Sequence, residues 1–109
     1  MIAEIICIRE LNDEFRKTLK GGKVLITKGV AKLSVTEQIA IMEKVKNFNQ
    51  FTHDNDPNGE HDFGAFDYCG IKYFWKIDYY DVDYLYLSPD PSKIAVTNRV
   101  LTIMRADEY

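Results

Sequence analysis

The sequence predicts a two-layer α+β domain in which an antiparallel sheet of about four strands carries two helices on one face. Two segments place apolar residues at helical spacing, and four others have the alternation or β-branched composition of strands. Their order is helix, strand, helix and then three strands, and consecutive strands with short connections favour antiparallel pairing. A chain of 109 residues suffices for one domain, so we assign residues 1–109 to a single domain.

The first helix is predicted over residues 2–20. Its apolar side chains recur at intervals of three or four residues: Ile8, Leu11, Phe15 and Leu19. Gly21 and Gly22 are expected to end it, because glycine adopts the positive φ that a helix end often needs.

The second helix is predicted over residues 35–49. Ser34 and Glu37 have the spacing of a capping box, in which each side chain bonds the other residue's backbone N–H. Two apolar stripes follow: Val35, Ile39 and Met42 on one, and Ile41, Val45 and Phe48 on the next.

Strands are predicted at residues 23–27, 63–68, 71–80 and 98–105. The third has apolar or aromatic residues at every second position from Ile71 to Tyr79, which is typical of a half-buried strand. Residues 51–62 are rich in Asp, Asn, Pro and Gly and predict a loop.

Composition excludes several classes of protein. A net charge of −3 argues against a polybasic nucleic-acid binder, and 46% hydrophobic residues argue against disorder. No apolar run reaches the roughly 18 residues that a membrane span needs. Glu4 interrupts the N-terminal apolar run and no basic residue precedes it, so we expect no export signal and a cytoplasmic protein. No cofactor is predicted.

Cys7 and Cys69 are too few and too far apart for a zinc pattern. Free thiols in a reducing compartment are the favoured interpretation, and a disulfide between them is the alternative.

Charge is distributed unevenly along the chain. Residues 1–53 hold nine Lys or Arg against six Asp or Glu, whereas residues 54–90 hold two against nine, a balance of −7. Solvated loops and strand edges explain such a cluster without any function. A metal or acid–base site and a surface for a basic partner are the functional alternatives.

The loop over residues 51–62 is the first candidate site. Asp54, Asp56, Asn58 and Gly59 resemble the start of a calcium-binding EF-hand loop, but Ala65 stands where the closing carboxylate belongs. A looser divalent site remains as an alternative, with Asp54, Asp56 and Asp78 as its ligands.

His61 could act in the same loop as a general base, oriented by Glu60 or Asp62. The competing interpretation is structural, with polar side chains that bond the loop's own backbone.

The second candidate site is the segment from Asp78 to Tyr86, where four tyrosines and three aspartates fall within nine residues. Not all of these tyrosines fit into a small core, and exposed aromatic clusters mark contact surfaces. The predicted partner-binding residues are Asp78, Tyr80, Asp81, Asp83, Tyr84 and Tyr86.

Several blocks carry a resemblance to a known family, among them Asn55-Asp56-Pro57, Gly59-Glu60-His61-Asp62-Phe63-Gly64 and Trp75-Lys76-Ile77-Asp78-Tyr79-Tyr80. From about Leu11 to Tyr109 the chain resembles a bacterial family of small proteins catalogued as a domain of unknown function. The resemblance implies an alphaproteobacterial origin and an association with mobile elements; it does not point to any particular catalytic activity.

Two hypotheses follow. The first is a non-enzymatic binding protein whose acidic, aromatic surface engages a basic protein partner, such as a nucleic-acid-binding complex. The mobile-element association makes an anti-CRISPR or anti-restriction inhibitor one form of it. The second is a small hydrolase or divalent-metal-dependent enzyme centred on His61. The lysines of the first half form only a modest basic face, which does not favour direct nucleic-acid binding.

Overall fold

The fold is a four-stranded sheet with helices on one face, seen here in a computed structural model that describes residues 2–109. The strands are β1 (Gly22–Ile26), β2 (Phe63–Tyr68), β3 (Ile71–Tyr80) and β4 (Asn98–Arg105). The last three have the predicted bounds, and the small α+β architecture is confirmed.

The sheet is mixed rather than wholly antiparallel. Its strand order is β1-β4-β3-β2, with antiparallel pairing of β2 with β3 and of β3 with β4. β1 lies parallel to β4, with Val24 opposite Leu101. The antiparallel expectation fails for this pair because β1 and β4 are not consecutive, so no short connection constrains their direction.

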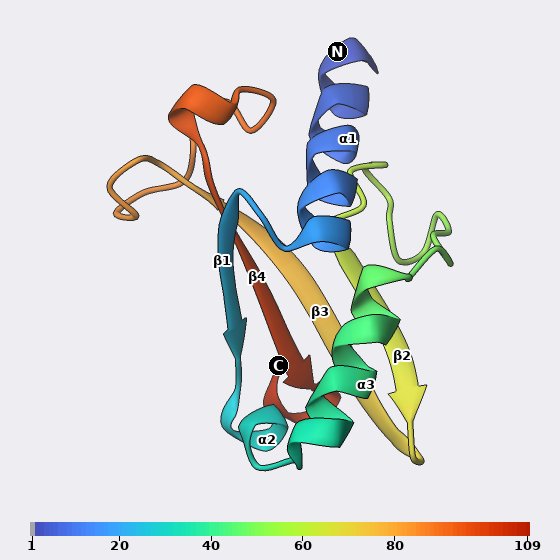
Figure 1. Cartoon of the computed structure of the whole chain (residues 1–109). Coiled ribbons are helices and arrows are strands. Elements are labelled where there is room, and N and C mark those ends of the chain that lie inside the picture. The colour runs from blue at the N-terminus through green and yellow to red at the C-terminus, as the bar shows by residue number, and fades with distance from the viewer. Residues whose placement is uncertain (1) are drawn as a thin grey trace.

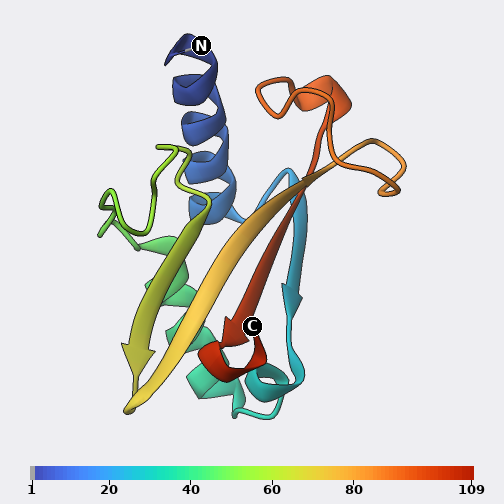
Figure 2. The same cartoon turned by 180° about the vertical axis from the view of Figure 1, so that it is seen from behind.

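Helices α1 (Ile2–Thr18) and α3 (Val35–Lys46) cover one face of the sheet, as predicted, and the other face carries no long helix (Figures 1 and 2). The C-terminal ends of the two helices approach each other in both views. Shorter elements are α2 (Lys28–Ala31) and the 3₁₀ turns η1 (Ile94–Val96) and η2 (Ala106–Glu108). None of the helices within residues 2–109 has the length and apolarity to cross a membrane.

Helix α1 ends two residues before its predicted end. Leu19 takes a φ of 59° and its N–H bonds the Phe15 carbonyl at 2.6 Å, so a leucine occupies the left-handed position expected of Gly21. The buried face of α1 holds Ile8 and Phe15, but it also holds Asn12 and Arg16.

Helix α3 begins with the predicted capping box. Ser34 Oγ accepts from Glu37 N at 3.1 Å, and Ser34 N donates to Glu37 Oε1 at 3.2 Å. One of its two stripes is core, with Ile41 and Val45 buried; in the other, Val35 and Ile39 are 73% and 59% exposed and Met42 alone packs against the core.

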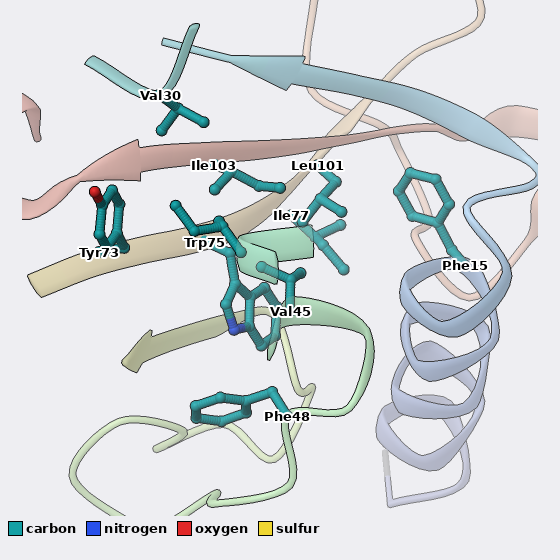
Figure 3. Close-up of a cluster of buried hydrophobic side chains, with 10 residues drawn as sticks. Phe15, Val30, Val45, Phe48, Tyr73, Trp75, Ile77, Leu101 and Ile103 are labelled. Carbon is teal, nitrogen blue, oxygen red and sulfur yellow. The ribbon is translucent and has the colours of Figure 1, made fainter. Parts of the chain in front are cut away.

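The core lies between α3 and the strands, where Trp75 and Leu101 are fully buried (Figure 3). The alternation of β3 is confirmed, with Tyr73, Trp75 and Ile77 facing the helices. At the end of the β2–β3 hairpin, Cys69 and Gly70 have φ values of 50° and 77°, the backbone of a tight I′ turn. Both cysteines are free thiols.

Gly64 lets the Trp75 indole lie directly on the backbone of β2. A Cβ at this position would overlap the indole nitrogen and meet the Phe48 ring at 2.9 Å. We therefore expect Gly64→Ala to lower the free energy of unfolding by about 1–3 kcal/mol, the usual cost of overpacking. Urea unfolding followed by Trp75 fluorescence measures it, and a change below about 0.5 kcal/mol would contradict this packing.

Candidate functional site

His61 lies between two carboxylates and an aromatic ring. Its Nδ1 is 2.9 Å from Asp13 Oδ1, and its Nε2 is 3.6 Å from Asp56 Oδ2. The imidazole stacks on Phe51 with centroids 3.7 Å apart and planes 4° from parallel. The carboxylates beside the imidazole are thus Asp13 and Asp56, not the neighbours Glu60 and Asp62 that spacing had indicated.

Arg16 is the neighbour that fixes Asp13. Its side chain is 1% exposed, and Nη2 donates to Asp13 Oδ1 at 3.0 Å. Nη1 donates to three carbonyls at the end of α3: Val45 at 2.9 Å, Lys46 at 3.2 Å and Phe48 at 3.0 Å. Val45 and Lys46 are the last residues of α3, where carbonyls lose their i+4 helical partners, so Arg16 of α1 caps the end of α3. The guanidinium also lies over Phe51 and Trp75.

A cleft of about 380 Å³ opens between the C-terminal ends of α1 and α3. We call it the Arg16 cleft; its polar lining comes from Asp13, Arg16, Lys17, Lys46, Asn47, Asn49 and His61. Phe48 and Phe51 supply its apolar part. Of these lining residues, His61 is the one that the sequence predicted as a site residue.

A second polar cluster is buried where α1 crosses β3 and β4. Arg99 Nε donates to Asn12 Oδ1 at 2.7 Å, and Asn12 Nδ2 donates to the Tyr79 hydroxyl at 2.7 Å. That hydroxyl donates to Glu60 Oε1 at 2.7 Å. Burial raises the pKa of Tyr79, and the bond to Glu60 adds to the rise. Burial also lowers the pKa of Arg99. Glu60 therefore anchors its loop to the sheet through the hydrogen bond from the Tyr79 hydroxyl.

The structure does not gather the predicted metal ligands. Asp78 Oδ2 pairs with Lys76 Nζ at 2.7 Å, Asp56 Oδ1 accepts from the His61 backbone at 3.1 Å, and Asp54 lies in an exposed turn. Within residues 2–109 no three His, Cys, Asp or Glu side chains form a group that could hold a metal ion.

The other predicted segment forms an exposed loop over residues 81–87, called here the 81–87 loop. Asp81 Oδ1 accepts from the backbone of Asp83 at 3.2 Å and of Leu85 at 3.0 Å, so this aspartate shapes the loop. The Tyr84 ring lies under Lys23 Nζ at 3.9 Å and is 6.3 Å from the Tyr80 ring.

The apolar side chains of this loop face solvent. Leu85, Tyr86 and Leu87 are 73%, 74% and 78% exposed. Of the predicted partner-binding residues, Asp83, Tyr84 and Tyr86 are exposed, whereas Asp78, Tyr80 and Asp81 are half-buried.

A signal for the missed residues was present in the sequence. Asn12 and Arg16 share the helical stripe of Ile8 and Phe15, and a polar residue on an apolar stripe is buried with a partner. Their partners could not be named, since they come from β3, β4 and the loop, far along the chain.

The Tyr79 hydroxyl joins Asn12 to Glu60, so its removal leaves both with an unmet bond. We expect Tyr79→Phe to lower the free energy of unfolding by about 1–2 kcal/mol. The matched control, Tyr86→Phe on a 74% exposed side chain, should leave it unchanged. Chemical denaturation of the two variants measures the difference, and equal effects would refute the network.

Burial, and secondarily the charge of Glu60, raises the pKa of Asp62 in the folded protein. An acid whose folded pKa is raised destabilises the fold once it ionises, that is, as pH rises through its ordinary value of 3.8. We therefore expect Asp62→Asn to be more stable than the parent at pH 7 and to lose that advantage as the pH falls to about 3. Thermal unfolding across this range tests it; a stability gain that does not depend on pH would assign the effect to another cause.

Comparison with known proteins identifies a family. No curated protein and no solved structure matches the chain. The sequence model of the family described as "Protein of unknown function (DUF3768)" matches residues 26–108. The match runs from the end of β1 through η2 and includes His61, the 81–87 loop, and Glu60, Tyr79 and Arg99 of the buried polar cluster, but not Asn12. The chain therefore belongs to this family of proteins of unknown function.

Proposed function

We propose that this protein is a non-enzymatic binding protein whose contact surface is the 81–87 loop. The observation that carries the proposal is the exposure of Leu85, Tyr86 and Leu87, three consecutive large side chains that are each more than 70% exposed. Contiguous exposed apolar groups are uncommon on a monomer and mark interaction surfaces.

The shape of the loop does not depend on these side chains. Asp81 binds two backbone N–H groups of the loop, and Asn98 Nδ2 donates to the Asp81 and Val82 carbonyls at 3.1 Å each. Tyr80 and Leu87 close the loop as a β-bridge. A loop held by polar contacts while its apolar groups face outward loses little entropy when a partner covers them.

The partner expected from this chemistry is a protein with an apolar pocket and a basic rim. The Asp83 side chain is exposed and makes no hydrogen bond or ion pair within residues 2–109, and residues 54–90 carry a balance of −7. Lys76 neutralises Asp78, so the charge available to a partner comes from the loop rather than from the strand. Such complementarity speeds association and rejects wrong partners.

Basic rims of this kind occur on proteins that bind nucleic acids. The finer form of the proposal is therefore an inhibitor of a cytoplasmic nucleic-acid-binding complex, of the anti-CRISPR or anti-restriction type. Its support is the loop's charge together with the mobile-element association that the family resemblance implies.

Affinity capture from the native host, followed by binding measurements with the captured partner, tests the contact surface. We expect the double variant Leu85→Ser/Leu87→Ser to lower the affinity by roughly tenfold or more, because burying a leucine side chain contributes about 1.5–3 kcal/mol that serine cannot supply. The control Val35→Ser/Ile39→Ser removes two apolar side chains of α3 that are 73% and 59% exposed, and it should bind like the parent. Undiminished binding by the loop variant would exclude this surface.

A second experiment tests whether the partner's rim is basic. Asp83→Asn should slow association with the same partner at low ionic strength, and the difference should shrink as salt is added, since exposed charges are screened within about 10 Å at 0.1 M. Stopped-flow or surface binding kinetics measure it. Equal association rates at low salt would show that the partner's rim is not basic.

A further inference from the structure

We propose that the Arg16 cleft is a binding site for a phosphate-class oxyanion, held by Lys17, Lys46 and the side-chain amide of Asn49. The site lies on the helix side of the molecule and is independent of the 81–87 loop. Three properties of the cleft support the inference: its basic residues, the N–H donors that are available to a ligand, and the presence of a single carboxylate among its lining residues.

The cleft has an excess of positive charge. Arg16, Lys17 and Lys46 line it, and Asp13 is its only carboxylate. That carboxylate is shared, because both Arg16 Nη2 and His61 Nδ1 contact it within 3.0 Å. In a chain of net charge −3, a cleft lined by three basic residues and one carboxylate departs in sign from the overall charge.

Neither of the two lysines is held in a buried contact. Lys17 is exposed and pairs with no carboxylate within residues 2–109, and Lys46 reaches Glu43 only at 3.7 Å on the surface. A basic residue at a helix C-terminus commonly serves the helix dipole. For α3, buried Arg16 already fills that role by donating to three terminal carbonyls. The ammonium of Lys46 is therefore available to a ligand.

The remaining polar groups also favour an anion. The Asn49 side chain is exposed and makes no hydrogen bond among the described residues, so its amide N–H groups can donate. Arg16 Nε is buried without an acceptor, so the guanidinium keeps its positive charge beneath the cleft but does not offer this N–H to a ligand. Lys17, Lys46 and the Asn49 amide all offer N–H donors, and charge-assisted N–H to oxyanion bonds are the strong class of hydrogen bond.

Phe48 and Phe51 determine which ligands larger than phosphate could fit in the cleft. They form an apolar wall beside the charged groups, with Phe51 stacked on His61. The same oxyanion chemistry could come from free phosphate or from the phosphate of a nucleotide whose base lies against this wall. Both sources are taken as arms of the experiment.

The test is a titration of the full chain with inorganic phosphate in low-salt buffer, followed by amide NMR. We expect saturable shifts confined to residues around Lys17, Lys46 and Asn49, with Kd at or below about 1 mM. A parallel titration with adenosine monophosphate separates the sources: equal affinities identify the oxyanion alone, and affinity at least about tenfold tighter identifies a nucleotide.

The variant Lys17→Ala/Lys46→Ala should weaken phosphate binding by about tenfold or more while the amide spectrum stays folded. The charge-matched control Lys20→Ala/Lys28→Ala removes two exposed lysines outside the cleft and should bind like the parent. The proposal is overturned by no saturable shift up to roughly 10 mM phosphate. Shifts spread over the whole basic surface, or an equal loss in both double variants, overturn it as well.

Discussion

The buried guanidinium of Arg16 is the contact on which the arrangement of the helices and the long loop depends. It caps α3 from α1, so moving the two helices apart would break the bonds from Arg16 to the Val45 and Phe48 carbonyls. Through Asp13 it also fixes the carboxylate that holds His61. A buried charge with this many partners costs desolvation, and in return it permits only one relative placement of the helices and the loop. The cleft beside it inherits its shape from that constraint.

Helix α1 divides the interior into two chemically different halves. Around α3 the interior is apolar and aromatic, centred on Trp75 and Leu101. Beneath α1 it is polar, because Asn12 accepts a hydrogen bond from Arg99 and donates one to the Tyr79 hydroxyl. The region matched by the family model begins at residue 26, so α1 lies outside it and yet supplies Asn12, Asp13 and Arg16 to residues within it. The backbone hydrogen bonds of the 81–87 loop, by contrast, come from Asp81 and Asn98 of the matched region, although Lys23 from outside it lies over the Tyr84 ring.

What the sequence could predict was local. The bounds of β2, β3 and β4 and the capping box of α3 follow from periodicity and spacing over ten residues or fewer, and the structure matches them. The parallel β1–β4 pair and the His61–Asp13 contact join residues far apart in the chain, which no local pattern encodes. The burial of Arg16 could not be predicted for a different reason. A lone arginine is usually a surface residue, and its burial becomes favourable only once the end of α3 is placed against it.

The strand order has a consequence for how the chain reaches this fold. β4 is the last strand in sequence, and it is the only one that pairs with β1. During synthesis from the N-terminus, the β2–β3 hairpin can form early, but β1 has no neighbour until residues 98–105 have emerged. The sheet is therefore completed in one late, non-local step, the pairing of β1 with β4. This step costs the entropy of closing the long chain segment between the two strands, and that cost arises before their contacts can offset it. Until then, the β1 edge and the β4-facing edge of β3 are unpaired, and chaperones or other nascent chains meet them first.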